Sequence, residues 1–260
     1  MKDTTRKKIV RWFWMLFGAG VASVVLLLAA VWAFADIPSF EELENPDSKL
    51  ATQVISSDGE VITTFHIENR SYVTFGELSQ NLVNAAVATE DVRFYNHSGI
   101  DFKSLGRVAV KTLLGGDSSQ GGGSTITQQL AKLLFTEQVS ANALNRVKQK
   151  ALEHVIAVRI EKQYTKKEII TLYLNKYDFG NNAVGIRSAA HVYFGKQPSQ
   201  LTVEEAAMLV GMCKNSSLYN PRRRPLTTLK RRNVVLGQMV KFGYLSAAEK
   251  DLICAPKRVT

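Results

Sequence analysis

Two neighbouring carboxylates are the first candidates for chemistry in this sequence. Glu90 and Asp91 follow an alanine-rich, otherwise apolar stretch with helical spacing. If Glu90 lies in partly apolar surroundings, lost solvation raises its pKa and prepares it to act as a general base. Taken alone, however, the pattern is more typical of a solvated helix end at which the two acids pair with Arg93.

A glycine- and serine-rich segment, residues 115–124, leads into a helix predicted to start at Ser124. Free backbone N–H groups at a helix start can bind phosphate or pyrophosphate. Gln128 and Lys132 share one helical face, with Gln129 beside them, and would add donors and a charge. The spacing is not that of a Walker A loop, because glycines stand where Lys and Ser/Thr are required. A mobile loop with an ordinary helix cap explains the segment about as well.

The third group lies on the helix predicted around residues 145–159. Arg146, Lys150 and Glu153 are spaced i, i+4 and i+7, so they share one stripe. Such a stripe is usually a surface salt-bridge ladder. A second carboxylate and a phosphate-type loop upstream favour a functional site instead.

Composition limits the class of protein. Among 260 residues there are 33 Lys and Arg against 23 Asp and Glu, a formal net charge of +10. This excludes an acidic disordered chain, a collagen-like fibre and a channel with many spans, and it favours an anionic partner.

Four scattered histidines do not support a zinc site, and a divalent cation such as Mg²⁺ is the one cofactor left open. For Cys213 and Cys254, small buried thiols are favoured over a bridge.

Residues 12–35 carry no charge and span about 36 Å as a helix, enough to cross a hydrocarbon core about 30 Å thick. Basic residues precede this stretch and acidic residues follow it, which predicts a cytoplasmic N-terminus and an exported remainder. A cleaved signal peptide is disfavoured because its apolar region would be shorter. Export excludes nucleic acid as a partner.

The remainder divides by pattern. Asp58-Gly59 between two β-branched runs predicts a hairpin, and helical spacing dominates after Glu77. We therefore expect a mainly α fold with a small β-hairpin element. The predicted segments are a cytoplasmic basic tail (1–11), a transmembrane anchor (12–35), a connector with the β element (36–75) and a catalytic domain (76–255).

Five segments, in order and spacing, resemble the motifs of the family-51 peptidoglycan glycosyltransferases. They are EDVRFYNHSG, GGSTITQQLAK, KALE, YLNKYDFGNNAVGIRSAAHVYFGK, and LTVEEAAMLVGM with YNPRRRP. The family forms the N-terminal half of class A penicillin-binding proteins and the whole of monofunctional transglycosylases, and the sequence leaves open which of these it represents. The resemblance implies a lysozyme-like glycosyltransferase domain. It also implies an inverting reaction that joins lipid II into β-1,4 glycan strands and releases undecaprenyl pyrophosphate, for cell wall biogenesis and cell shape.

The resemblance also implies residue roles. Glu90 matches the catalytic base for the acceptor sugar 4-hydroxyl, and Glu153 matches the second catalytic glutamate, which assists at the donor pyrophosphate. Lys150 would neutralise that leaving group. Gln149 stands where the family has arginine, and Arg146, one turn earlier, is expected to supply the charge. The substrate-binding positions are Asp91, Ser124, Gln129, Lys132, Arg146 and Lys150.

The implied partners are lipid II, the growing glycan strand, membrane lipids and other cell-wall synthesis proteins, and the implied location is the bacterial inner membrane. Residues 105–114 read equally well as an interfacial helix or a core helix. The basic residues at 222–224 and 230–232 could meet phospholipid headgroups or the emerging strand. A lysozyme-like peptidoglycan hydrolase and a non-catalytic cell-wall scaffold are the alternative functions.

Overall fold

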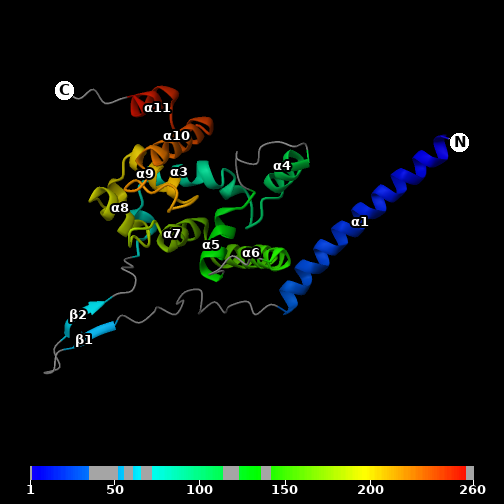
Figure 1. Ribbon diagram of the computed structural model, residues 1–260, viewed down its shortest axis with the longest axis horizontal. Coiled ribbons are helices and arrows are strands. Elements are labelled where there is room, and N and C mark those ends of the chain that lie inside the picture. The colour runs from blue at the N-terminus through cyan, green and yellow to red at the C-terminus, as the bar shows by residue number, and fades with distance from the viewer. Residues whose placement is uncertain are drawn as a thin grey trace.

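The computed structural model describes residues 2–34, 52–55, 61–65, 72–113, 123–135 and 142–255. Helix α1 (Lys2–Phe34) is continuous and projects away from a body of shorter helices (Figure 1). It contains nearly all of the apolar stretch predicted as an anchor. Among the helices with described positions, none is both long and apolar enough to cross a membrane. The membrane crossing therefore stays a prediction from the sequence.

The β element is confirmed as a pair of short strands. β1 (Thr52–Ile55) and β2 (Val61–Phe65) run antiparallel, with Thr52 opposite Phe65. An irregularity in register falls between Val54 and Ile55. The Asp58-Gly59 turn lies outside the described residues.

In the rest of the described chain the named elements are helices, as the sequence pattern predicts, and one isolated β-bridge joins Asp178 and Val184. Its elements are η1 (Phe75–Glu77), α3 (Gln80–Glu90), η2 (Phe94–Asn96), α4 (Phe102–Leu113), α5 (Ile126–Phe135), α6 (Ala143–Gln163), α7 (Lys166–Lys176), α8 (Ile186–Phe194), η3 (Pro198–Gln200), α9 (Val203–Met212), α10 (Pro225–Lys241) and α11 (Ala247–Cys254).

Local sequence explains where several of these helices begin. Ser79 accepts a hydrogen bond from the Leu82 N–H and caps α3. Capping boxes start α7, α9 and α11, each pairing a hydroxyl residue with a glutamate three positions later. An N-cap of this kind stabilises a helix by about 1 kcal/mol. The helix starts are thus set by short-range sequence.

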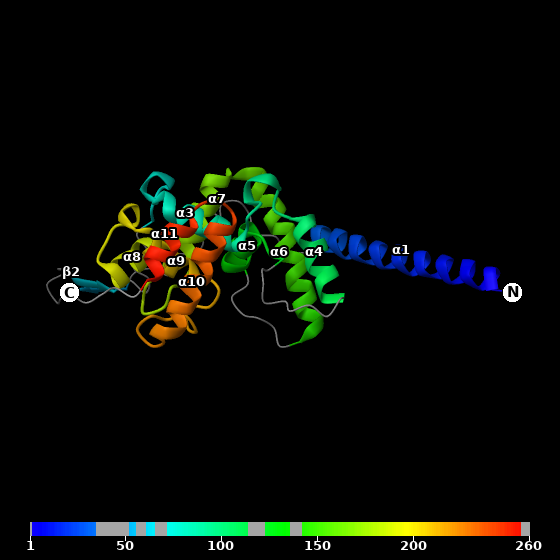
Figure 2. The same cartoon turned by 90° about the horizontal axis from the view of Figure 1, so that it is seen from above.

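The core forms where two groups of helices meet. Helices α3, α9 and α10 pack together, and α5 packs against α6 and α7 (Figures 1 and 2). Leu82 of α3, Leu130 of α5 and Leu236 of α10 are fully buried. This arrangement brings the C-terminal end of α3 beside α5, which places the first sequence motif against the second.

Glycine permits one close approach that shapes the site. Gly99 has φ +90°, and a Cβ there would lie 2.9 Å from the backbone carbon of Ala157 on α6. Only glycine fits both this conformation and this gap. The loop after α3 therefore rests directly on α6.

Candidate active site

Glu90 is the last residue of α3, and only 13% of its side chain is exposed. The Gln129 amide on α5 donates a hydrogen bond to Glu90 Oε2 at 2.9 Å. Burial raises the pKa of Glu90, while Gln129 and the nearby Arg231 act in the opposite direction. The burial on which the predicted base depended is present, and the solvated helix end is wrong for this residue. Arg93, its expected partner there, is bonded to Asp101 instead.

Arg231 on α10 places a cation beside Glu90, with Nη2 3.8 Å from Glu90 Oε1. Its Nε donates to the Gly211 carbonyl at 3.3 Å, and its guanidinium lies 5.7 Å from the Tyr219 ring centroid. The expectation that Arg231 faces phospholipid headgroups or the emerging strand with the other basic residues of 222–224 and 230–232 is wrong, because this side chain is mostly buried beside Glu90. Helical spacing could have revealed it, since Thr228 and Val235, three before and four after it, are both buried.

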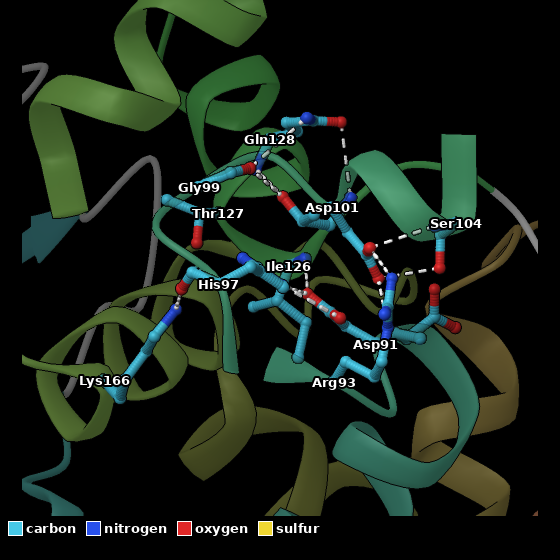
Figure 3. A network of polar contacts seen from close by, with 12 residues as sticks. Asp91, Arg93, His97, Gly99, Asp101, Ser104, Ile126, Thr127, Gln128 and Lys166 are labelled. Atoms are coloured by element: carbon cyan, nitrogen blue, oxygen red, sulfur yellow. Dashed lines mark hydrogen bonds and ion pairs between the residues drawn. The ribbon is translucent and has the colours of Figure 1, made fainter. Parts of the chain in front are cut away.

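Asp91 is buried and bonded within the protein. Its Oδ2 accepts the Ile126 N–H at 3.1 Å and lies 2.9 Å from His97 Nε2 (Figure 3). Ile126 is the first residue of α5, so the Asp91 carboxylate sits at the positive end of that helix. Its described contacts connect the end of α3 to the start of α5.

Further hydrogen bonds fix the loop between α3 and α4. The Gly99 carbonyl accepts from Thr125 Oγ1 at 2.7 Å and from Gln128 Nε2 at 3.3 Å (Figure 3). Gln128 is therefore buried and turned inward, and the expectation that it adds a donor on the face of Lys132 is wrong. Asp101 accepts from the Ser104 N–H at 3.0 Å and so starts α4.

Lys166 ties the same loop to α6 and α7. Its Nζ donates to the His97 carbonyl at 2.7 Å and to Glu161 at 2.6 Å, and it lies 4.5 Å from the Phe94 ring centroid. Thr127 of α5 also donates to Glu161, at 2.5 Å. Contacts among α5, α6, α7 and the loop after α3 thus fix the backbone that follows Glu90.

Glu153 is buried on α6 and forms an ion pair with a lysine of the same helix. Lys150 Nζ lies 2.6 Å from Glu153 Oε2 and donates to Ser124 Oγ at 3.1 Å. The Lys150 side chain is 46% exposed, whereas that of Glu153 is 8% exposed. The predicted stripe is therefore a site with a buried acid and a more accessible cation rather than an exposed ladder.

Helix α5 connects the two carboxylates, since Ser124 precedes it and Gln129 lies within it. The structure brings together six of the predicted site residues in this way. Lys132 and Arg146 are exposed, and the described contacts link neither to the carboxylates. The predicted phosphate loop before Gly123 lies outside the described residues. The connected residues are Glu90, Asp91, Ser124, Gln129, Lys150 and Glu153.

The described residues also bear on metal binding and on the two cysteines. Among the residues with described positions, no group of three or more His, Cys, Asp or Glu side chains could hold a metal ion. Cys213 is free and buried, as favoured, and Cys254 is free and partly exposed.

The described helices thus hold two mostly buried carboxylates. Glu90 is suited to accept a proton, and Glu153 holds the ammonium group of a lysine. Residues 58–240 match the Transglycosylase family, and the chain belongs to this family.

Proteins with similar sequences support this family membership. Penicillin-binding protein 1A of Pseudomonas aeruginosa is 36% identical over 92% of this chain and 28% of its own length. The proteins of the same name from Aquifex aeolicus and Escherichia coli are 38% and 36% identical, over 88% and 94% of this chain and 31% and 28% of their own lengths. The chain thus spans less than a third of these relatives.

Among solved structures, penicillin-binding protein 1A from Haemophilus influenzae matches with a TM-score of 0.43 and 23% identity, over 81% of this chain and 21% of that one. A likeness of this strength does not establish the arrangement of the helices.

Proposed function

We propose that this chain is a peptidoglycan glycosyltransferase domain that polymerises lipid II into β-1,4 glycan strands with inversion, releasing undecaprenyl pyrophosphate. Family membership supports the class of reaction. The observation that carries the proposal is the presence of two mostly buried carboxylates connected through α5. Glu90 accepts from the Gln129 amide with Arg231 3.8 Å away, and Glu153 is in contact with a lysine.

Glu90 is proposed as the general base that removes the proton from the acceptor 4-hydroxyl. Its raised pKa makes it a stronger base than an exposed glutamate, while Gln129 and Arg231 favour its ionised form. Because one Oε atom accepts from Gln129, the carboxylate is held in a defined orientation.

Lys150, Ser124 and Glu153 are proposed to act at the donor pyrophosphate. A departing pyrophosphate needs cations and N–H or O–H donors more than it needs a proton. Glu153 holds the Lys150 ammonium beside Ser124, and the exposed part of Lys150 is accessible to an anion. Lys132 and Arg146 are exposed cations on α5 and α6 and are proposed to add to the same field.

Asp91 is proposed to support the substrate site indirectly, through its hydrogen bonds within the protein. By bonding the Ile126 N–H and His97, it sets where α5 begins and therefore where Gln129 lies relative to Glu90.

We also propose that residues 12–35 anchor the domain in the bacterial inner membrane with the N-terminus in the cytoplasm. The charge asymmetry around this stretch supports the orientation. Trp12 and Trp14 stand at the start of this stretch, where indole rings favour a membrane interface.

The test is polymerisation of lipid II by the full chain in detergent, followed by gel separation of glycan products. Glu90→Gln should lower the rate by about 10²- to 10⁴-fold, the usual contribution of a general base. Glu204→Gln, a matched change on α9, should keep the wild-type rate. Absence of polymer with the wild-type protein would refute the function, and an unimpaired Glu90→Gln protein would refute the role of Glu90.

A further inference from the structure

A buried tyrosine stands behind the proposed base. Tyr173 on α7 is fully buried, and its hydroxyl donates to Gln129 Oε1 at 3.1 Å. The other end of the same amide, Nε2, donates to Glu90 Oε2 at 2.9 Å. A single chain of hydrogen bonds therefore runs from α7 through α5 to the end of α3.

We propose that Tyr173 is a positioning residue, which holds the Gln129 amide with its N–H toward Glu90 and so orients the base and favours its ionised form. The inference rests on the proposed function, because that function makes Glu90 the base. Tyr173 itself acts through Gln129.

The direction of these hydrogen bonds follows from the chemistry of the groups. The two ends of a glutamine amide are nearly equal in shape, so only their partners decide which end faces which way. An ionised carboxylate can only accept, and it therefore requires the N–H end. Burial raises the pKa of Tyr173 well above its ordinary value, so this hydroxyl keeps its proton and can donate to the oxygen end.

Loss of the Tyr173 hydroxyl would leave Gln129 Oε1 without its donor. The amide could then rotate, and its hydrogen bond to Glu90 would weaken. Because donation from Gln129 lowers the pKa of Glu90 against the effect of burial, the pKa of Glu90 should rise. Among the described residues, the other titratable or charged groups that interact with Glu90 are Asp91, Tyr177, Cys213, Lys214 and Arg231. Of these, Cys213 also contacts the Tyr173 hydroxyl.

Tyr177 provides a matched control on the same helix. It lies one turn after Tyr173, and its hydroxyl donates to the Met212 carbonyl at 2.9 Å, not to Gln129. Each substitution to phenylalanine removes one hydrogen-bonded hydroxyl and no charge, the Tyr177 side chain being partly buried. The two variants therefore differ in whether the lost hydroxyl holds the amide.

The experiment compares Tyr173→Phe and Tyr177→Phe in the full chain. It measures the pH profile of kcat for lipid II polymerisation and the ¹³C titration of the Glu90 carboxyl, assigned with Glu90→Gln. Tyr173→Phe should lower kcat at neutral pH about two- to ten-fold, the range expected for one hydrogen bond. It should also move the acidic limb and the ¹³C titration to higher pH, whereas Tyr177→Phe should change neither.

A double-mutant cycle separates positioning from a general packing defect. Gln129→Leu alone should raise the pKa of Glu90, and adding Tyr173→Phe should raise it no further. An unchanged Glu90 titration in either single variant, or an equal effect of Tyr173→Phe without Gln129, would overturn the inference. Because the ¹³C titration does not need turnover, a wild-type protein that makes no polymer would refute the proposed function separately.

Discussion

Glu90 and Glu153 are the same residue type in two different surroundings. Glu90 accepts a hydrogen bond from a neutral amide N–H at 2.9 Å, and the Arg231 guanidinium lies 3.8 Å away. Glu153 has a lysine ammonium at 2.6 Å, within its own helix. Both carboxylates are mostly buried, so burial alone does not distinguish them.

The distance of the cation makes the difference. Desolvation dominates at Glu90 and raises its pKa although Arg231 opposes it from 3.8 Å, and this suits a group that must take up a proton. At Glu153 the carboxylate holds Lys150 where its exposed side can meet an anion. The comparison suggests that one site handles a proton and the other a negative charge, and substitutions can test this division.

Of the three effects considered next, the loss of rate in Lys150→Met should be the largest. It removes the cation proposed to face the pyrophosphate and leaves the buried Glu153 without its partner. We expect kcat/KM for lipid II polymerisation to fall about 10²-fold, the order found when one donor to a developing anion is removed. Steady-state kinetics would measure this.

The control is Lys148→Met, an exposed change on the same helix, which should have little effect. The acidic limb of the Lys150→Met profile should stay where the wild-type limb lies, because that limb belongs to Glu90. A shifted limb would mean that the two carboxylates do not act separately.

Arg231→Gln should have an intermediate effect and the opposite signature. A cation beside a carboxylate favours its ionised form, so removing Arg231 raises the pKa of Glu90 further. We expect the acidic limb of kcat to move to higher pH, with a loss of roughly two- to ten-fold at neutral pH that is recovered in more alkaline buffer. Lys230→Gln, its exposed neighbour on α10, should leave the limb unchanged. A uniform loss at all pH values would contradict this role.

The smallest effect expected is that of Glu90→Gln on stability, which is measured separately from its loss of rate. Because the folded-state pKa of Glu90 is raised, the native state binds this proton more tightly than the unfolded chain does. Its contribution to stability is therefore full below the ordinary glutamate pKa and is lost as pH rises through the folded value.

Glutamine cannot ionise, so the variant avoids the cost of burying a charged carboxylate. It should therefore melt about 2–4 °C above the wild type at neutral pH. The difference should disappear near pH 4, where the wild-type carboxyl is protonated. Thermal unfolding followed by circular dichroism at both pH values would measure this. A variant less stable than the wild type at neutral pH would contradict the prediction.

Most of the helices and the identity of the two acids could be predicted from the sequence. Helical spacing, hydroxyl residues followed by Glu at helix starts and the Asp58-Gly59 signal all act over a few residues. The roles of Gln128 and Arg231 could not be predicted as easily. Each belongs to a polar or basic run, and which member turns inward depends on what packs against that helix face.

The sequence by itself thus determined the helical class, the order of the motifs and the presence of Glu90 and Glu153, because composition and short-range spacing carry that information. Only the tertiary structure decided which groups surround each acid. Gln129 lies 39 residues from Glu90 and Tyr173 lies 44 residues from Gln129, and no local pattern links them. The packing of α3, α5, α7 and α10 determines how deeply the carboxylate is buried, how far it lies from a cation and which way the amide points. These three properties decide what a carboxylate can do.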